Sequence, residues 1–111
     1  MSSIRRITLR KEKEDQWHFG PESWEIRFRD ETVGRVVHTE KGYEITLRTL
    51  KKNPEESDNP NCIWEWKPYH ISKDFCGLKV FLRMNNDILK ERFDKLLTAE
   101  EAHYGKSKEN R

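Results

Sequence analysis

The sequence lacks the features that would mark a membrane protein or a secreted disulfide scaffold. No apolar run exceeds the three residues of Val80–Leu82, whereas a membrane-spanning helix needs about 20 apolar residues. The basic start of the chain has no apolar stretch of the kind found in signal peptides. Two cysteines, Cys62 and Cys76, are too few for a disulfide framework. We therefore expect a soluble protein of a reducing compartment, by default cytoplasmic.

Glycine is scarce and scattered, and no metal-binding or catalytic motif is present. The five glycines form neither a G-x-G-x-x-G nor a Walker pattern. Cys62, His70 and Cys76 lack the closely spaced ligand pairs of structural zinc sites, so we interpret both cysteines as small buried side chains. His70, Asp74 and Cys76 include the residue types of a cysteine nucleophile, but only proximity in the sequence groups them. We expect no enzyme, cofactor or metal, with an undetected activity as a minor alternative.

The composition predicts one folded domain with a strongly charged surface. Of the 111 residues, 33% are apolar and 38% are charged, and the net charge is only +2. Low hydrophobicity predicts disorder only together with high net charge, and here acidic and basic residues nearly cancel. We expect a single domain over residues 1–104. Within it we expect a flexible loop over residues 51–61, which have no apolar side chain, and after it a disordered tail over residues 105–111.

Alternating apolar and polar residues predict strands in the first two thirds of the chain. They fall at residues 4–11, 17–19, 23–29, 32–39, 43–50 and 62–67, with Pro68 ending or kinking the last. Glu40–Gly42 fits a three-residue hairpin loop with glycine in the left-handed position.

Apolar residues at helical spacing then predict a helix over residues 73–97, with Ser72 as its N-cap. Asn86 leaves open a division into two helices. Strands followed by a helix indicate an α+β fold, in which an antiparallel sheet of four to five strands has one face packed by a C-terminal helix.

Arginines gather on the polar side of the predicted strands. If this side faces solvent, it forms a basic surface suited to phosphate groups. Cross-strand Arg–Glu pairing on an ordinary solvated face is the alternative interpretation. A single-stranded DNA or RNA site on this surface would use Arg6, Arg10, Arg27, Arg29, Arg48, Lys51 and Lys52. Trp24, Phe28 and Tyr43 fall on the opposite, apolar side. The basic side therefore lacks these aromatic side chains, on which nucleic-acid bases would stack.

The remaining aromatic residues favour a protein partner. Tryptophan, tyrosine and arginine dominate the binding energy of protein interfaces, although the same aromatics would alternatively complete the core. We therefore expect a small non-enzymatic protein-binding module, with nucleic-acid binding as the alternative, and a homodimer is a further option because an open sheet has edges to protect. The residues expected to bind a protein or nucleoprotein complex are Arg27, Arg29, Arg48, Trp64, Trp66 and Tyr69.

In element order, the chain resembles small single-strand-binding coactivator domains, in which antiparallel strands precede a helix. In size and composition it is similar to small accessory proteins of phages and mobile elements, which bind and block a larger machine. Neither resemblance rests on a motif, so neither assigns a residue role. The second implies an accessory or inhibitor protein.

Overall fold

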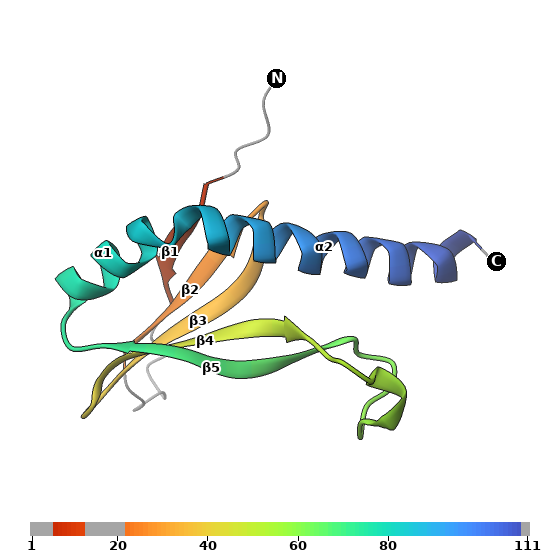
Figure 1. Cartoon of the computed structure of the whole chain (residues 1–111), viewed down its shortest axis with the longest axis horizontal. Coiled ribbons are helices and arrows are strands. Elements are labelled where there is room, and N and C mark those ends of the chain that lie inside the picture. The colour runs from red at the N-terminus through yellow and green to blue at the C-terminus, as the bar shows by residue number, and fades with distance from the viewer. Residues whose placement is uncertain (1–5, 13–21, 110–111) are drawn as a thin grey trace.

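A computed structural model describes residues 6–12 and 22–109. All five strands belong to one antiparallel sheet in the order β1-β2-β3-β4-β5, and the helices lie along one side of it (Figure 1). This arrangement confirms the expected α+β class and the antiparallel sheet. The elements are β1 (Thr8–Lys11), β2 (Ser23–Phe28), β3 (Glu31–Thr39), β4 (Gly42–Leu50), the 3-10 helix η1 (Pro54–Glu56), β5 (Trp64–Ser72), α1 (Phe75–Met84) and α2 (Asn86–Glu109).

Two tight hairpins join the central strands. Between β2 and β3, Arg29 and Asp30 have φ of 53° and 62°, as the two central residues of a type I′ turn do. Between β3 and β4 the loop is two residues long rather than the expected three, because Gly42 already pairs with Thr39. Gly42 has a φ of 130°, and a Cβ there would lie 2.3 Å from the carbonyl oxygen of Ser72. Glycine is therefore required at this position for both conformation and space.

Strand β5 is longer than predicted because it continues through Pro68. The register against β4 shifts at this point: Ile45 pairs with His70, whereas Thr46 pairs with Pro68, so Tyr69 is the extra residue of a bulge. Proline is tolerated at bulges and on edge strands, where its missing N–H costs no ladder hydrogen bond. The expected strand over residues 17–19 lies outside the described residues.

The helical region is divided at Asn85, and its first cap differs from the prediction. Asp74, not Ser72, is the N-cap of α1, and its carboxylate accepts a hydrogen bond from the Gly77 amide. Helix α2 then runs to Glu109, well past residue 97 and into the segment predicted as a disordered tail. The loop over residues 51–61 contains η1, and Lys51 Nζ donates to Ser57 Oγ and to the Asn59 carbonyl.

The core lies between the helices and the sheet. Phe28 of β2 meets Phe93 of α2 with ring centroids 5.9 Å apart. Trp24, Tyr43 and Phe75 form a second ring cluster that packs against the core. The expected placement of Trp24, Phe28 and Tyr43 on the apolar side is thus confirmed. The buried apolar residues are Ile26, Phe28, Val33, Val36, Ile45, Leu47, Leu78, Leu89, Phe93, Leu96 and Leu97.

Candidate functional site

Arg48 is not on an open basic face, contrary to the sequence-based expectation. Only 8% of the residue is exposed. Its guanidinium donates to the Thr32 carbonyl oxygen and to the Glu100 carboxylate, and lies 4.2 Å from the ring centroid of Trp64. Arg48 therefore ties the ends of β3 and β4 to α2.

The reason lies in the pairing of β4. Strand β3 accompanies β4 only as far as Leu47. Beyond it, residues 48–50 pair with residues 64–66 of β5 alone, and we call this pair of segments the β4–β5 ribbon. Two-stranded ribbons twist more strongly than full sheets. The alternation of burial stops at this point, since both Leu47 and Arg48 are buried.

Arg29 is likewise directed at α2 instead of at solvent. It is the first residue of the tight β2–β3 turn and not part of β2. Its guanidinium forms ion pairs with Asp94 at 3.3 Å and with Glu101 at 2.7 Å. The prediction that Arg29 lies on an exposed sheet face is therefore wrong, because strand alternation ends with β2.

The arginines of β1 and β2 do lie on the side of the sheet away from the core, but they are paired. Arg10 and Arg27 both reach Glu25, at 2.5 and 4.0 Å. Arg27 also donates to Thr32 Oγ1 and to the carbonyl oxygen of Asp30. Cross-strand pairing of arginine with glutamate, the alternative interpretation of this face, is confirmed for Arg10 and Glu25. A similar pair joins Lys11 to Glu22, and the hydrogen bond from Lys11 lowers the pKa of the Glu22 carboxyl.

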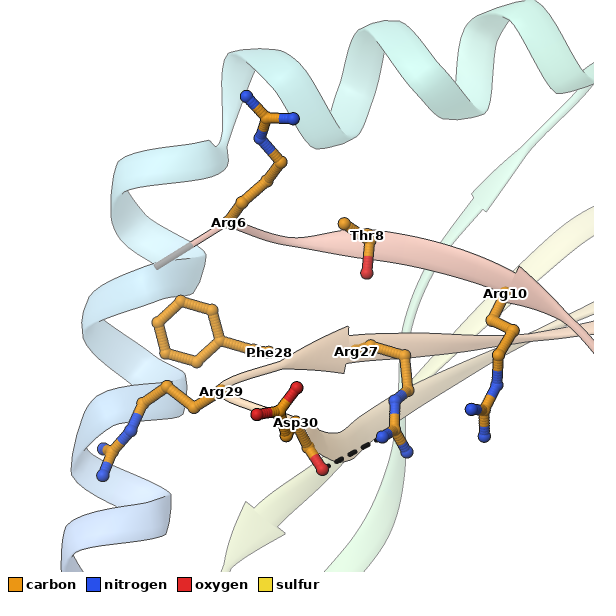
Figure 2. A pocket seen from close by; sticks show the side chains of 7 residues that line it. All are labelled: Arg6, Thr8, Arg10, Arg27, Phe28, Arg29 and Asp30. Atoms are coloured by element: carbon orange, nitrogen blue, oxygen red, sulfur yellow. Dashed lines mark hydrogen bonds between the residues drawn. The ribbon is translucent and has the colours of Figure 1, made fainter. Parts of the chain in front are cut away.

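An open hollow of about 690 Å³ lies between the start of β1 and the β2–β3 turn, and Figure 2 shows its lining. Four of the predicted nucleic-acid-binding residues, Arg6, Arg10, Arg27 and Arg29, contribute to it. The guanidiniums point in different directions: that of Arg6 stands apart, and that of Arg29 is directed to the helix (Figure 2). The structure therefore brings these arginines together without aiming them at one point.

The two lysines predicted alongside them lie at the far end of the ribbon. Lys51, Lys52 and Lys67 line a smaller hollow of about 260 Å³, together with Glu56 and Glu65. Sequence reasoning placed Lys51 and Lys52 beside the arginines, whereas the hollow that they line shares no residue with the arginine hollow.

The ribbon also carries Trp66, the most exposed Trp, Tyr or Phe side chain among the residues whose side chains are described. Arg48 pairs with Trp66 and Leu50 pairs with Trp64, so these four side chains share one face. The Trp64 and Trp66 rings meet edge to face at 5.3 Å. Trp64 packs against the core, whereas Trp66 is 46% exposed and Leu50 beside it is also exposed. We call Leu50, Trp64 and Trp66 the tryptophan patch.

Two of the predicted protein-binding residues join this patch, and the others do not. Trp64 and Trp66 lie together with Arg48 behind them, but Tyr69 packs on Phe81 and under the guanidinium of Arg92. Arg27 and Arg29 line the arginine hollow instead. Leu50 was not predicted as a site residue. Leu50 is two residues from Arg48, so alternation puts it on the polar side of the strand. An apolar residue on that side was the sequence signal that could have identified it.

In the part of the chain that the structure describes, the cysteines and histidines do not come together in a metal-binding group. Among residues 6–12 and 22–103, whose side chains are described, no group of three or more His, Cys, Asp or Glu side chains could hold a metal ion. His70 stacks flat on Phe81 at 3.8 Å, and the Cys62 thiol donates to the Trp64 carbonyl oxygen. The prediction that both cysteines are buried is wrong, because Cys76 is exposed on α1 and Cys62 is half-buried.

Neither hydropathy nor comparison with known proteins adds an assignment. Within the part of the chain that the structure describes, no helix is long and apolar enough to cross a membrane. Comparison with protein-family models, with curated proteins and with solved structures finds no match.

Proposed function

We propose that the protein is a non-enzymatic protein-binding module of the accessory or inhibitor kind. It docks on a larger protein or nucleoprotein complex through the tryptophan patch. The observation that carries the proposal is the position of Trp66, which is 46% exposed on a paired strand and braced edge-on by Trp64. A large ring that is half in water and already held in place is typical of an interface hot spot.

The support behind the patch makes it rigid. Trp64 is fixed from one side by the core and from another by the Arg48 guanidinium, which in turn is held by Thr32 and Glu100. Ordering a flexible side chain on binding costs about 0.5–1.5 kcal/mol. Because Trp66 and Trp64 are already ordered by these contacts, little of that cost remains when a partner binds.

The charges around the small hollow, next to the end of the ribbon, favour an acidic partner surface. Lys51, Lys52 and Lys67 outnumber Glu56 and Glu65 around the small hollow. Complementary charges at the edge of an interface mainly raise the association rate and the specificity. We therefore propose a partner with an apolar groove for Trp66 and carboxylates near the lysines.

The arginine hollow favours nucleic-acid binding as the second candidate function, but its charges are largely compensated. Arg10 and Arg27 share Glu25, and Arg29 is paired with Asp94 and Glu101. Binding to a phosphate backbone depends on releasing counterions with unpaired cations. The only aromatic residue of the lining, Phe28, is 1% exposed and cannot stack on a base. Protein binding is for these reasons the better supported function.

A photo-crosslinking experiment in the native host tests the proposal. A benzophenone amino acid is placed at Trp66 and, as a control, at Ile71, which lies on the same strand and is 47% exposed. We expect a discrete crosslinked protein at position 66 and not at 71. Trp66→Ala should then weaken binding of that protein by roughly tenfold or more, as hot-spot residues do, while Ile71→Ala leaves it unchanged.

Equal crosslinking at both positions, or none at position 66, would contradict the proposal. Titration with labelled single-stranded oligonucleotides at two salt concentrations separates the second candidate. Binding at about 150 mM salt that falls several-fold when the salt is doubled would transfer the function to the arginine hollow.

A further inference from the structure

A second apolar surface lies on the solvent side of the helices, opposite the residues that fill the core. Val80, Met84 and Ile88 are 45%, 79% and 61% exposed. They are spaced four residues apart, and residues at that spacing form a ridge along one helix face. We call these three residues the apolar ridge. Scattered exposed apolar residues are ordinary, whereas three neighbours in a row form a surface.

The ridge is continuous across the junction of α1 and α2. Asn85 N donates to the Phe81 carbonyl at 3.0 Å, and Leu89 N donates to the Asn85 carbonyl at 2.9 Å. These are helical i to i−4 bonds, so the helical repeat persists through the bend that Figure 1 shows between the two helices. Met84 is thus one turn from both Val80 and Ile88.

A row of charges runs beside the ridge and has a distinctive order. Lys79, Arg83, Asp87 and Glu91 are also spaced four residues apart, and all are exposed. The row therefore has two positive charges followed by two negative charges. Arg83 and Asp87 have no ion pair or hydrogen bond in the described part of the chain, and the exposed Glu91 pairs only with Lys95 at 3.6 Å.

We propose that the apolar ridge docks against the same ridge of a second copy of the chain, with the two helices antiparallel around a two-fold axis at Met84. In a two-fold interface, if residue i of one copy contacts residue j of the other, then residue j of the first also contacts residue i of the second. Met84 then meets Met84 of the other copy, and Val80 meets Ile88. The charge row is centred at Asn85, one residue away, so the same axis places Arg83 opposite Asp87 and Lys79 opposite Glu91.

The charge order selects this occupant and this orientation. A parallel arrangement would place like charges opposite each other, which is destabilising, whereas the antiparallel one makes four complementary contacts per dimer, two from each copy. Ridges formed by residues four apart also interlock with one another, in the most common class of helix packing. The surface is therefore complementary to itself in both shape and charge.

The sheet edges are less suited to self-association. Strand β1 has only four residues, and the other edge strand, β5, contains Pro68 and exposed Lys67. A short strand, a proline and a lysine all discourage pairing with another strand. We accordingly place the homodimer, which the sequence left as an option, at the helices and not at the sheet.

Sedimentation equilibrium of the full chain tests the dimer directly. The wild type should approach twice the mass of the chain as its concentration rises. Met84→Glu should raise the dimer dissociation constant roughly tenfold or more, because it places two carboxylates face to face on the axis. Since Met84 is largely exposed, the variant should fold, and Ile71→Glu, at an exposed site on β5, serves as the matched control. A wild type that stays monomeric, or a dimer that tolerates Met84→Glu, would overturn the proposal.

Cysteine crosslinking checks the axis. In a Cys62→Ser, Cys76→Ser background, Met84→Cys lies opposite itself and should form a disulfide-linked dimer under mild oxidation. Lys95→Cys, on an exposed turn of α2 far from the axis, should do so several-fold less. Equal crosslinking at the two positions would refute the two-fold axis.

A charge exchange checks the orientation. Arg83→Glu and Asp87→Arg should each weaken the dimer several-fold, because each opposes like charges, and the double variant should recover wild-type affinity. Additive losses in the double variant would refute the antiparallel pairing.

Discussion

Four arginines to which the sequence gives the same position in an alternating pattern fall into two groups with opposite environments. Arg29 and Arg48 turn toward α2 and bind its carboxylates. Arg10 and Arg27 lie across the sheet from the core and bind within their own face. The first group joins the sheet to α2, whereas the second contacts residues of the sheet and of the β2–β3 turn. We expect burial of the ion pair, more than its geometry, to decide how much each arginine contributes to stability.

The comparison is tested most strongly at Arg48. Arg48→Ala leaves the Glu100 carboxylate, whose side chain is 17% exposed, without its cation, and breaking a buried ion pair costs about 3–5 kcal/mol. We expect a loss of that size in the free energy of unfolding, measured by urea denaturation. Arg48→Met combined with Glu100→Leu should recover much of the loss, because a buried pair replaced by apolar residues is often neutral. A loss as small as that at Arg10 would remove the distinction between the groups.

Arg29 should have an intermediate effect. Its ion pairs to Asp94 and Glu101 are partly exposed, so Arg29→Ala should lower the free energy of unfolding by about 1 kcal/mol. Arg29→Gly removes the same ion pairs but relieves the positive φ of 53°, which costs other residues about 1 kcal/mol. We expect the glycine variant to be the more stable of the two in thermal and urea unfolding. If alanine proved equal to glycine, the turn would not be strained.

Arg10 should have the smallest effect. Its side chain is well exposed beside Glu25, and an exposed ion pair contributes about 0.2–1 kcal/mol or less. Arg10→Ala should therefore change the urea midpoint little, and 1 M salt should abolish the difference from wild type. Glu25→Gln serves as its control from the acidic side. If Arg10→Ala lowered the free energy of unfolding as much as Arg29→Ala, and salt did not remove the difference, Arg10 would belong with Arg29 and Arg48.

The strands and the class of fold follow from local patterns. Alternation placed β2, β3 and β4 within one residue or so, since the buried face of a strand must be apolar at every second position. The helix was also visible, but its end was not: α2 continues over a polar stretch to Glu109. Apolar periodicity reports where a helix is packed and is silent where a helix extends beyond its contacts.

The candidate site was predicted in part. Trp64 and Trp66 were named from their residue type, and the structure brings them together with Leu50 on one face. Tyr69 was grouped with them as another aromatic residue outside the predicted apolar side, but at the bulge next to Pro68 its ring packs on Phe81. A one-residue bulge shifts the following side chains to the other face of the strand, and the alternation of apolar and polar residues does not reveal where a bulge occurs.

The sequence by itself determined the strand periodicity and the apolar residues available for an α+β fold, because those depend on neighbours in the chain. Only the tertiary structure decided which charges are buried. Arg48 is buried because β3 stops pairing at Leu47 and the twisted ribbon meets α2, which contributes Glu100 from 52 residues along the chain. Such a contact depends on where distant elements end, and no local pattern encodes it.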